Sequence, residues 1–394
     1  MTRRSTLLAS NYNAWPEPFN GQAYAFLNVI QALENADLLC PGPAAYAAGR
    51  GVKPSFPYLI GELRHRTLAQ ARRKLGKGTL SSMMPQTVAR DYDLFMFMCQ
   101  FPLELGALDS IKGWRERSGQ AVCYLLESWP HRFEEQKGDL KLLDKFDCVF
   151  VLNADSIPAL SKYTSAPLSF LPTGTDTLLA TPLPNNPQRC IDVLSIGRKE
   201  QVMHDKLVDL ASSDNDFYYM HDITRAGSVP NWREHRLQTA DTIKRSKYFM
   251  AYDLPVDKAG VDKGIKKYAL STRYFEGAAG GAVLLGSAQE TPKFKEYFDW
   301  DDAVIDLPLD TADLRGFFAD LNSQKERIDH IRLTNVVQSL RRHDWAHRWG
   351  QILDTLGLER PAGLETRLEA LASLADAAEK AGGPTAARDQ RIIA

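Results

Sequence analysis

The sequence lacks the features that mark several common classes of protein. Its 394 residues contain only five cysteines, which are scattered without a CxxC pair or a zinc-ligand spacing. An odd, dispersed set of thiols predicts a reducing compartment rather than a disulfide scaffold. No run of eighteen apolar residues occurs, so we expect no membrane-spanning helix. The apolar stretch 7–9 is too short for the core of a signal peptide.

Charge of one sign is also lacking, because 48 lysines and arginines balance 49 aspartates and glutamates. The net charge of −1 creates no global field, and we expect no nucleic-acid partner. No GxGxxG motif follows the first predicted strand, which disfavours a nicotinamide-dependent dehydrogenase. No Ser/His/Asp pattern is visible either. The chain instead has an ordinary globular composition, and its length suggests two or three domains.

Short apolar strands alternate with helical segments in two successive sets. The first set starts with a strand over residues 5–10, and the second with a strand over 191–196. Such alternation predicts an α/β protein with parallel, doubly wound sheets. We predict long helices at 103–118 and 311–340. Between the sets, residues 181–187 hold three prolines, which indicates a stiff connector.

The stretch 271–287 predicts a helix followed by a buried strand. Its first half places apolar residues on one helical face. Gly280 and Gly281 then stop the helix, since glycine adopts the left-handed conformation at little cost. Residues 282–285 form an apolar run that is typical of a parallel strand covered on both faces.

Polar residues mark the N-terminal end of the same helix. Ser271 or Thr272 can cap it, and Arg273 and Glu276 are spaced to share one face. A helix N-terminus with exposed amides, an arginine and a glutamate suits a ligand that carries both phosphate and hydroxyl groups. The alternative is an ordinary helix–turn–strand with a surface ion pair.

This stretch, with its Arg-x-Phe-Glu start and paired glycines, resembles the nucleotide-sugar half of GT-B glycosyltransferases. It is most similar to the bacterial "glycosyl transferases group 1", a family-4-like type that includes the spore-maturation-protein-like branch. The resemblance implies that Glu276 binds the ribose hydroxyls of the nucleotide. It also implies that the helix N-terminus faces the diphosphate, and that Arg273, Gly280 and Gly281 belong to the donor site.

Two other segments resemble the same group. Residues 170–176 resemble the Pro-x-Gly-x-Asp segment that leaves the first domain, and His343, Trp345 and Arg348 resemble a closing His-x-aromatic-x-x-Arg pattern. The resemblance implies a GT-B fold, in which two Rossmann-like domains face a cleft and a C-terminal helix crosses back to the first domain. The expected divisions are an acceptor domain at 1–172, a hinge at 173–189, a nucleotide-sugar domain at 190–340, the crossover helix at 341–358, and an appended helix and tail at 359–394.

Arg198 follows the strand predicted at 191–196 and matches a Gly-Arg pair of the family, which implies contact with the diphosphate and a catalytic role. The alternative is a solvated loop arginine. Lys206 is the candidate for a second phosphate-binding cation, although neither Lys199 nor Lys206 has the spacing common in the family. Tyr268 stands where many relatives carry a second glutamate, which leaves open how the sugar is bound.

Candidate acceptor-side residues follow two strands of the first set. Ligands of open α/β sheets bind at the carboxyl ends of strands, so we expect Trp15, Asn20 and Gly21 to line the acceptor side. Glu127 and His131 follow another strand and are candidates for catalysis, with His131 orienting or deprotonating an acceptor hydroxyl. The alternatives are a loop tryptophan that only packs and a structural histidine.

The resulting hypothesis is a glycosyltransferase that acts in glycan, glycolipid or glycoconjugate synthesis. Transfer requires a stabilised leaving diphosphate, a positioned acceptor hydroxyl and a water-poor site. The resemblance implies that cations and helix dipoles suffice without metal or cofactor, with a nucleotide-diphosphate sugar as co-substrate. Two alternatives are a GT-B-fold sugar-nucleotide epimerase or hydrolase, and a degenerate binding module, for which Tyr268 is the best support. Retention or inversion of stereochemistry stays open.

Residues 62–79 predict a basic helix that could contact anionic lipid or an anionic acceptor. A solvated surface face is the alternative. The dispersed thiols and the lack of a membrane-spanning run predict a cytoplasmic protein. The basic segment 62–79 adds the hypothesis of peripheral contact at the inner membrane face.

Overall fold

Apolar runs of the chain form two parallel sheets in the computed structural model, which describes residues 4–34, 36–43, 83–222, 227–252 and 270–382, with a few positions between 67 and 81. Each sheet belongs to one of two compact units. The first unit comprises Met1–Pro172, Ser228–Trp232 and Gln351–Gly363. The second unit comprises Thr173–Gly227, Arg233–Gly350 and Leu364–Ala394.

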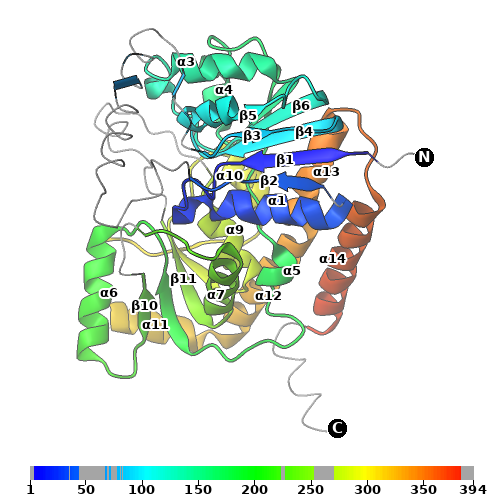
Figure 1. The fold of residues 1–394 in the computed structure, drawn as a ribbon. Helices are drawn as coiled ribbons and strands as arrows, with labels where there is room; N and C mark the ends of the chain where they lie inside the picture. Colours follow the sequence, from blue (N-terminus) through cyan, green and yellow to red (C-terminus); the bar gives the residue numbers. More distant parts are fainter. Residues whose placement is uncertain are drawn as a thin grey trace. The chain divides into compact units, whose positions relative to one another are not determined.

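In the part of the chain that the structure describes, the sheet of the first unit has six parallel strands in the order β2-β1-β4-β6-β7-β8. Figure 1 labels β1, β2, β4 and β6 of this sheet. Its central strands, with sequences such as the run from Leu94 to Cys99, are buried on both faces, as an all-parallel sheet requires. Met96 lies opposite Leu8 on one side and Val122 on the other. The strands are β1 (Thr6–Ser10), β2 (Asp37–Leu39), β4 (Tyr92–Cys99), β6 (Ser118–Leu125), β7 (Cys148–Val151) and β8 (Leu168–Phe170).

Short helices connect these strands. Besides α1 (Gly21–Glu34), they are η1 (Pro18–Asn20), η2 (Pro102–Ser110), η3 (Pro130–Arg132), α3 (Lys137–Leu140), η4 (Lys141–Lys145), η5 (Ala154–Ser156) and α4 (Ile157–Leu160). The long helix predicted at 103–118 is wrong. The chain forms η2 and then β5 (Ile111–Lys112), which pairs with β3 (Gln86–Thr87). Gly113 follows with a φ of +77°, a left-handed conformation that turns the chain.

Within the described residues, the sheet of the second unit has five parallel strands in the order β10-β9-β11-β12-β13. Figure 1 labels β10 and β11 of this sheet. They are β9 (Ile191–Ser195), β10 (Tyr219–His221), β11 (Ser246–Ala251), β12 (Val283–Gly286) and β13 (Ile305–Asp306). The helices of this part of the chain are α5 (Thr177–Ala180), α6 (Gln201–Ser213), α7 (Trp232–Lys244), α9 (Thr272–Ala279), α10 (Pro292–Tyr297), α11 (Leu314–Ser323), α12 (Lys325–Arg342), α13 (Trp345–Thr355) and α14 (Ala362–Lys380). The helix predicted at 311–340 is in fact α11 and α12, because Gln324 leaves the helical conformation between them.

Both sheets share one strand order. Numbered along the chain, the strands of each sheet begin 2-1-3-4-5, and the order reverses between the first and third strands. These reversals are the switch points at which doubly wound sheets bind ligands. They fall between β1 and β4 in the first unit and between β9 and β11 in the second. The predicted α/β class with two Rossmann-like parallel sheets is confirmed, whereas the cleft between the domains stays a prediction.

The C-terminal part of the chain contributes to both units. Residues Gln351–Gly363 belong to the first unit, in which Nε2 of Gln351 donates to the carbonyl of Phe170 at 3.3 Å. In the second unit, Arg367 donates to the fully buried Asp344 and to Asp176. These hydrogen bonds and the charge of Arg367 keep the pKa of Asp344 low against the opposing effect of burial.

The residues of the closing motif are buried in the second unit. The ring of His343 contacts those of Phe275 and Phe298, at 4.9 and 5.0 Å, and burial holds the pKa of His343 well below the usual value. Arg348 donates to the carbonyl of Thr173 at 2.9 Å. None of the helices that the structure describes combines the length and apolar character needed to cross a membrane. Segment 62–79 lies largely outside the described residues.

Candidate nucleotide-sugar site

The turn after β9 forms the core of the candidate site at the switch point of the second sheet. Gly197 has a φ of +77°, and its amide donates to Oδ2 of Asp222 at 3.0 Å. A β-carbon at this position would lie 3.1 Å from Nη2 of Arg273. Glycine is therefore required for the backbone conformation and for the close approach of that arginine.

Arg273 extends from α9 to this turn. Its Nε donates to the carbonyl of Ile196 at 3.0 Å, and its Nη2 donates to the carbonyl of Arg198 at 2.8 Å. Burial, and after it the charge of Arg198, lower the pKa of Arg273 to about 10. The structure thus brings these two predicted donor residues together and leaves the Arg198 side chain exposed. Two neighbouring cations at one sheet edge favour a bound anion.

The N-terminus of α9 adds backbone donors to the same place. The side chain of Ser271 accepts from the amide of Arg273 at 3.4 Å, which makes Ser271 the cap rather than Thr272. Amides of the first helical turn have no partner within the helix and carry a partial positive charge. Phosphate oxygens accept hydrogen bonds from N–H groups of this kind, which are present in the turn after β9, on the Arg273 guanidinium and at this helix end.

Glu276 pairs with a residue that the sequence analysis missed. Its Oε1 lies 2.5 Å from Nη2 of Arg236 on α7, and both side chains are at most 15% exposed. The surface ion pair between Arg273 and Glu276, offered above as the alternative, is therefore wrong: Arg273 is held by backbone carbonyls and Glu276 by Arg236. No short-range pattern could identify Arg236, which lies forty residues earlier in the chain.

Other predicted donor residues make structural contacts. Nζ of Lys206 donates to the carbonyls of Leu309 and Thr311, at 2.7 and 2.9 Å, and so connects α6 to the segment after β13. Lys199, the other cation considered, donates to Oδ1 of Asp222 at 2.6 Å. The donor-binding role of Lys206 stays a prediction.

The paired glycines lie at the opposite end of α9 from Arg273. Gly280 caps the helix with a right-handed φ of −76°, whereas Gly281 takes the left-handed conformation at +64°. A β-carbon on Gly280 would lie 2.4 Å from Cγ2 of Ile243, which is closer than packing allows. These glycines thus permit the close packing of α9 on its neighbours, and their role in donor binding stays a prediction.

In the first unit, the loops after β1 and β4 meet through aromatic side chains. The ring of Trp15 lies 5.8 Å from Phe19 and 6.3 Å from Phe101. Nδ2 of the buried Asn20 donates to the carbonyl of Trp15 at 2.7 Å, and Gly21 begins α1. The three predicted acceptor-side residues therefore lie together, and their role on the acceptor side stays a prediction.

Glu127 lies close by, after β6. Its Oε1 accepts from Nε2 of Gln100 at 2.6 Å, and its Oε2 accepts from Nε1 of Trp129 at 3.1 Å. His131 is partly buried in the short helix η3 that follows. Gln100 was missed by the sequence analysis, although it directly follows strand β4 and a carboxyl strand end is the expected position for a ligand-binding side chain.

Glu104 is a second carboxylate at this edge. It is buried and accepts from the backbone amides of Gln100 and Phe101, at 3.3 and 3.0 Å. Burial raises its pKa to about 7, with a smaller contribution from the charge of Glu127. The signal that could have found it is a glutamate three residues after the start of a helix, as in a capping box. Among the described residues, no group of three or more His, Cys, Asp or Glu is placed to hold a metal ion.

A comparison with protein families matches the part of the chain that contains the candidate site. Residues 204–354, which include α9 and its partner helix α7, match a family model described as "Glycosyl transferase-like". No curated protein sequence matches the chain.

Solved structures share the fold at low sequence identity. An α,α-trehalose-phosphate synthase (UDP-forming) from Burkholderia vietnamiensis is 12% identical over 92% of this chain and 98% of its own, with a TM-score of 0.52. An α-glucosyltransferase in complex with UDP-glucose and DNA containing an abasic site is 11% identical over 90% and 99%, with a TM-score of 0.50. The chain spans only 58% of a chain of the GtfA/B complex, at 10% identity and a TM-score of 0.36. The first two similarities establish the GT-B fold.

Proposed function

We propose that this protein is a glycosyltransferase that moves a sugar from a nucleoside-diphosphate donor to an acceptor hydroxyl. The observation that carries the proposal is the contact of Arg273 with the carbonyls of Ile196 and Arg198. It places two cations and the N-terminus of α9 at the switch point of the second sheet. The family match over residues 204–354 supports the proposal independently.

The cations at this edge suit the chemistry of the leaving group. Negative charge grows on the diphosphate as the bond to the sugar breaks, so groups placed there stabilise the transition state more than the ground state. The exposed Arg198 offers a planar fork that can bind two phosphate oxygens. Arg273 is fixed by its two carbonyl contacts, and its other N–H groups are proposed to contact the diphosphate.

Glu276 is the proposed ligand for the ribose hydroxyls. Arg236 contacts its Oε1 and limits the positions that the carboxylate can take. A carboxylate accepts hydrogen bonds and cannot donate them, so it is matched to a diol. In this proposal, Oε2 accepts from the ribose.

The first unit is the proposed acceptor domain. Trp15 offers an apolar ring face, and Glu127 and His131 offer polar groups for an acceptor such as a sugar or a lipid-linked alcohol. His131 is proposed to orient or deprotonate the acceptor hydroxyl. The narrower assignment to the family-4-like and spore-maturation branch stays a prediction.

Thermal unfolding in the presence of nucleoside diphosphates and their sugars tests the proposal. A donor present at 100 times its Kd should stabilise the native state by about 2.7 kcal/mol. UDP-sugars are the first choice, because UDP is named for two proteins that share the fold. Nucleoside diphosphate should then be released only when an acceptor is present. Failure of every donor to raise the Tm would contradict the proposal, and sugar rearrangement without acceptor would indicate an epimerase instead.

A further inference from the structure

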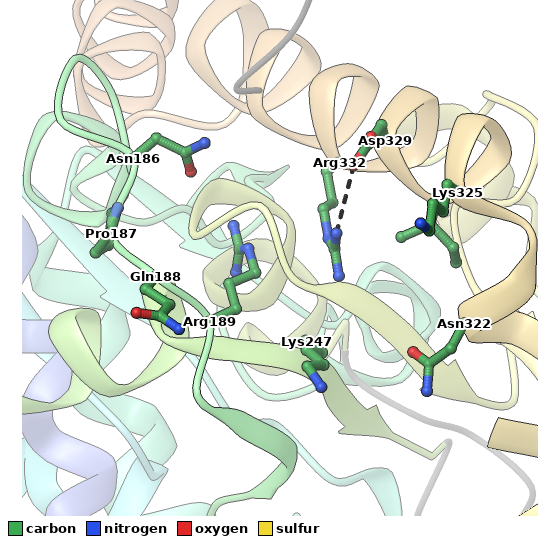
Figure 2. A pocket seen from close by; sticks show the side chains of 10 residues that line it. Asn186, Pro187, Gln188, Arg189, Lys247, Asn322, Lys325, Asp329 and Arg332 are labelled. Atoms are coloured by element: carbon green, nitrogen blue, oxygen red, sulfur yellow. Dashed lines mark hydrogen bonds and ion pairs between the residues drawn. The ribbon is translucent and has the colours of Figure 1, made fainter. Parts of the chain in front are cut away.

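A cavity lies in the second unit at the amino ends of its strands, away from the candidate nucleotide-sugar site. It has a volume of about 350 Å³, and Figure 2 shows the side chains that line it. Arg189 comes from the segment just before β9, and Lys247 from the start of β11. Lys325 and Arg332 come from α12. The cavity thus lies at the amino ends of the strands, whereas Arg198 follows the carboxyl end of β9.

Positive charge dominates the lining of this cavity. Among the described residues that line it, Arg189, Lys247, Lys325 and Arg332 are basic and Asp329 alone is acidic. Figure 2 shows Asp329 beside Arg332 on the same helix, with Oδ1 of Asp329 3.5 Å from Nη1 of Arg332. Lys247 is paired with Asp192, which lies outside the lining, at 2.6 Å. The distance from Asp329 to Arg332 is long for a charge-assisted hydrogen bond, so Asp329 offsets the other three cations only in part.

The charge of the two arginines, Arg189 and Arg332, is only partly offset by Asp329. Burial lowers the pKa of Arg189 to about 9, and the charge of Arg332 is the next cause. Burial also lowers the pKa of Arg332, and its Nε has no hydrogen-bond partner in the described part of the chain. Two desolvated guanidinium groups that repel each other are stabilised by an anion bound near both.

Hydrogen bonds to backbone carbonyls fix the guanidinium of Arg189 in a position where it can bind an anion. Its Nη1 donates to the carbonyl of Ser246 at 2.6 Å and its Nη2 to that of Gly280 at 3.0 Å. A fixed guanidinium loses little conformational freedom when it binds an anion. The amide side chains of Asn186, Gln188 and Asn322 also line the cavity, and amides suit hydroxyl groups.

We propose that this cavity binds a small sugar phosphate at a site separate from the proposed nucleotide-sugar site. The phosphate contacts Arg189 and Arg332, with Lys325 at the rim, and the sugar hydroxyls contact the amides. The volume is at the low end of the range for ligand pockets, which suits a phosphorylated monosaccharide better than a nucleotide sugar. The inference does not depend on the proposed function.

Calorimetric titration with a hexose 6-phosphate, and separately with inorganic phosphate, tests the inference. The wild-type protein should bind the hexose phosphate, and Arg332→Gln and Lys325→Ala should each weaken binding at least tenfold. The matched controls are Arg327→Gln, on the same helix but outside the cavity lining, and Lys295→Ala, an exposed lysine on α10. Both should bind like wild type. The exposed Lys325 variant keeps the test valid if Arg332→Gln does not fold.

Several results would overturn the inference. The first is that the wild-type protein does not bind the hexose phosphate. The second is that Arg332→Gln and Arg327→Gln weaken its binding equally. The third is that neither Arg332→Gln nor Lys325→Ala changes its binding. The last outcome would place the hexose phosphate elsewhere, such as on the acceptor side. Inorganic phosphate binding as tightly as the hexose phosphate would refute the sugar-specific part. Titration of the same variants with UDP separates this inference from the proposed function, because the cavity variants should bind UDP like wild type.

Discussion

The carboxyl edges of the two sheets share a strand order but differ in chemistry. At the edge of the first sheet, the polar side chains are carboxylates and an amide, with Glu104 and Glu127 joined through Gln100. At the edge of the second sheet, Arg273 reaches the backbone of Arg198, and the carboxylates there, Asp222 and Glu276, are paired with Lys199 and Arg236. The shared topology determines where ligands bind, and the side chains determine which ligands fit.

Desolvation acts in opposite directions on these two edges. It raises the pKa of Glu104 to about 7, which favours the neutral acid, and lowers the pKa of Arg273 to about 10. Even so, Arg273 stays charged at neutral pH, whereas Glu104 titrates near neutrality. The second edge therefore offers permanent positive charge for a diphosphate, and the first offers groups that can donate or accept at a hydroxyl.

Removing a cation from the second edge should have the largest effect. Arg198→Ala should lower kcat and kcat/KM together, by about 10²–10³-fold or about 2.7–4 kcal/mol, because the cation matters most as the diphosphate leaves. Steady-state assay of donor turnover measures this. Arg315→Ala, an exposed arginine on α11, should leave turnover unchanged. Wild-type turnover in Arg198→Ala would contradict the proposal that Arg198 binds the leaving diphosphate.

Replacing the buried Glu104 of the first edge by glutamine should remove a pH dependence of the free energy of unfolding. The folded-state pKa of Glu104, about 7, exceeds the ordinary value of 4.5, so its stabilising effect is complete below pH 4.5 and is lost as pH rises through 7. The loss should reach about 3 kcal/mol in the free energy of unfolding. Urea denaturation of wild type and Glu104→Gln at several pH values measures it. If the free energy of unfolding changed with pH in the same way in both proteins, Glu104 would not be the cause of the pH dependence.

Gly280→Ala tests whether the paired glycines serve packing or ligand binding. The new β-carbon would lie 2.4 Å from Ile243, and such overpacking should cost about 1–3 kcal/mol of stability. Gly227→Ala is the control, since nothing lies within 4 Å of its added β-carbon, and it should change stability by less than about 0.5 kcal/mol. Thermal unfolding compares the two. A Gly280→Ala protein of wild-type stability with weak donor binding would instead favour the ligand-binding role.

The smallest predicted effect concerns Glu276. Glu276→Gln should weaken donor binding by about tenfold, or about 1.4 kcal/mol, because a charge-assisted bond to the ribose is lost. Calorimetry with a normal and a 2′,3′-dideoxy donor measures the coupling. The dideoxy donor should lose the same affinity on wild type and little further on the variant. Losses that simply add would show that Glu276 binds Arg236 alone and no ribose.

Much of the second edge was predictable because its signals are local. The apolar run at β12 predicts a buried strand, Ser271 or Thr272 predicts a helix start, and the apolar run 191–196 predicts the strand that Arg198 follows. Each depends on residues within about one helical turn or one strand of each other. The break between α11 and α12 was missed because Gln324 carries no strong helix-stopping signal.

The sequence by itself determined the two parallel sheets and the cation that follows β9. Burial on both faces of a strand requires an apolar run, and such runs are visible without knowledge of their neighbours. Only the tertiary structure decided that Arg236 pairs with Glu276, and that Gln100 links Glu104 to Glu127. The tertiary structure alone also brought together the arginines and lysines that line the cavity at the amino ends of the strands. These contacts join residues that are distant in the chain, and their geometry depends on how helices pack on a sheet, which no spacing in the sequence records.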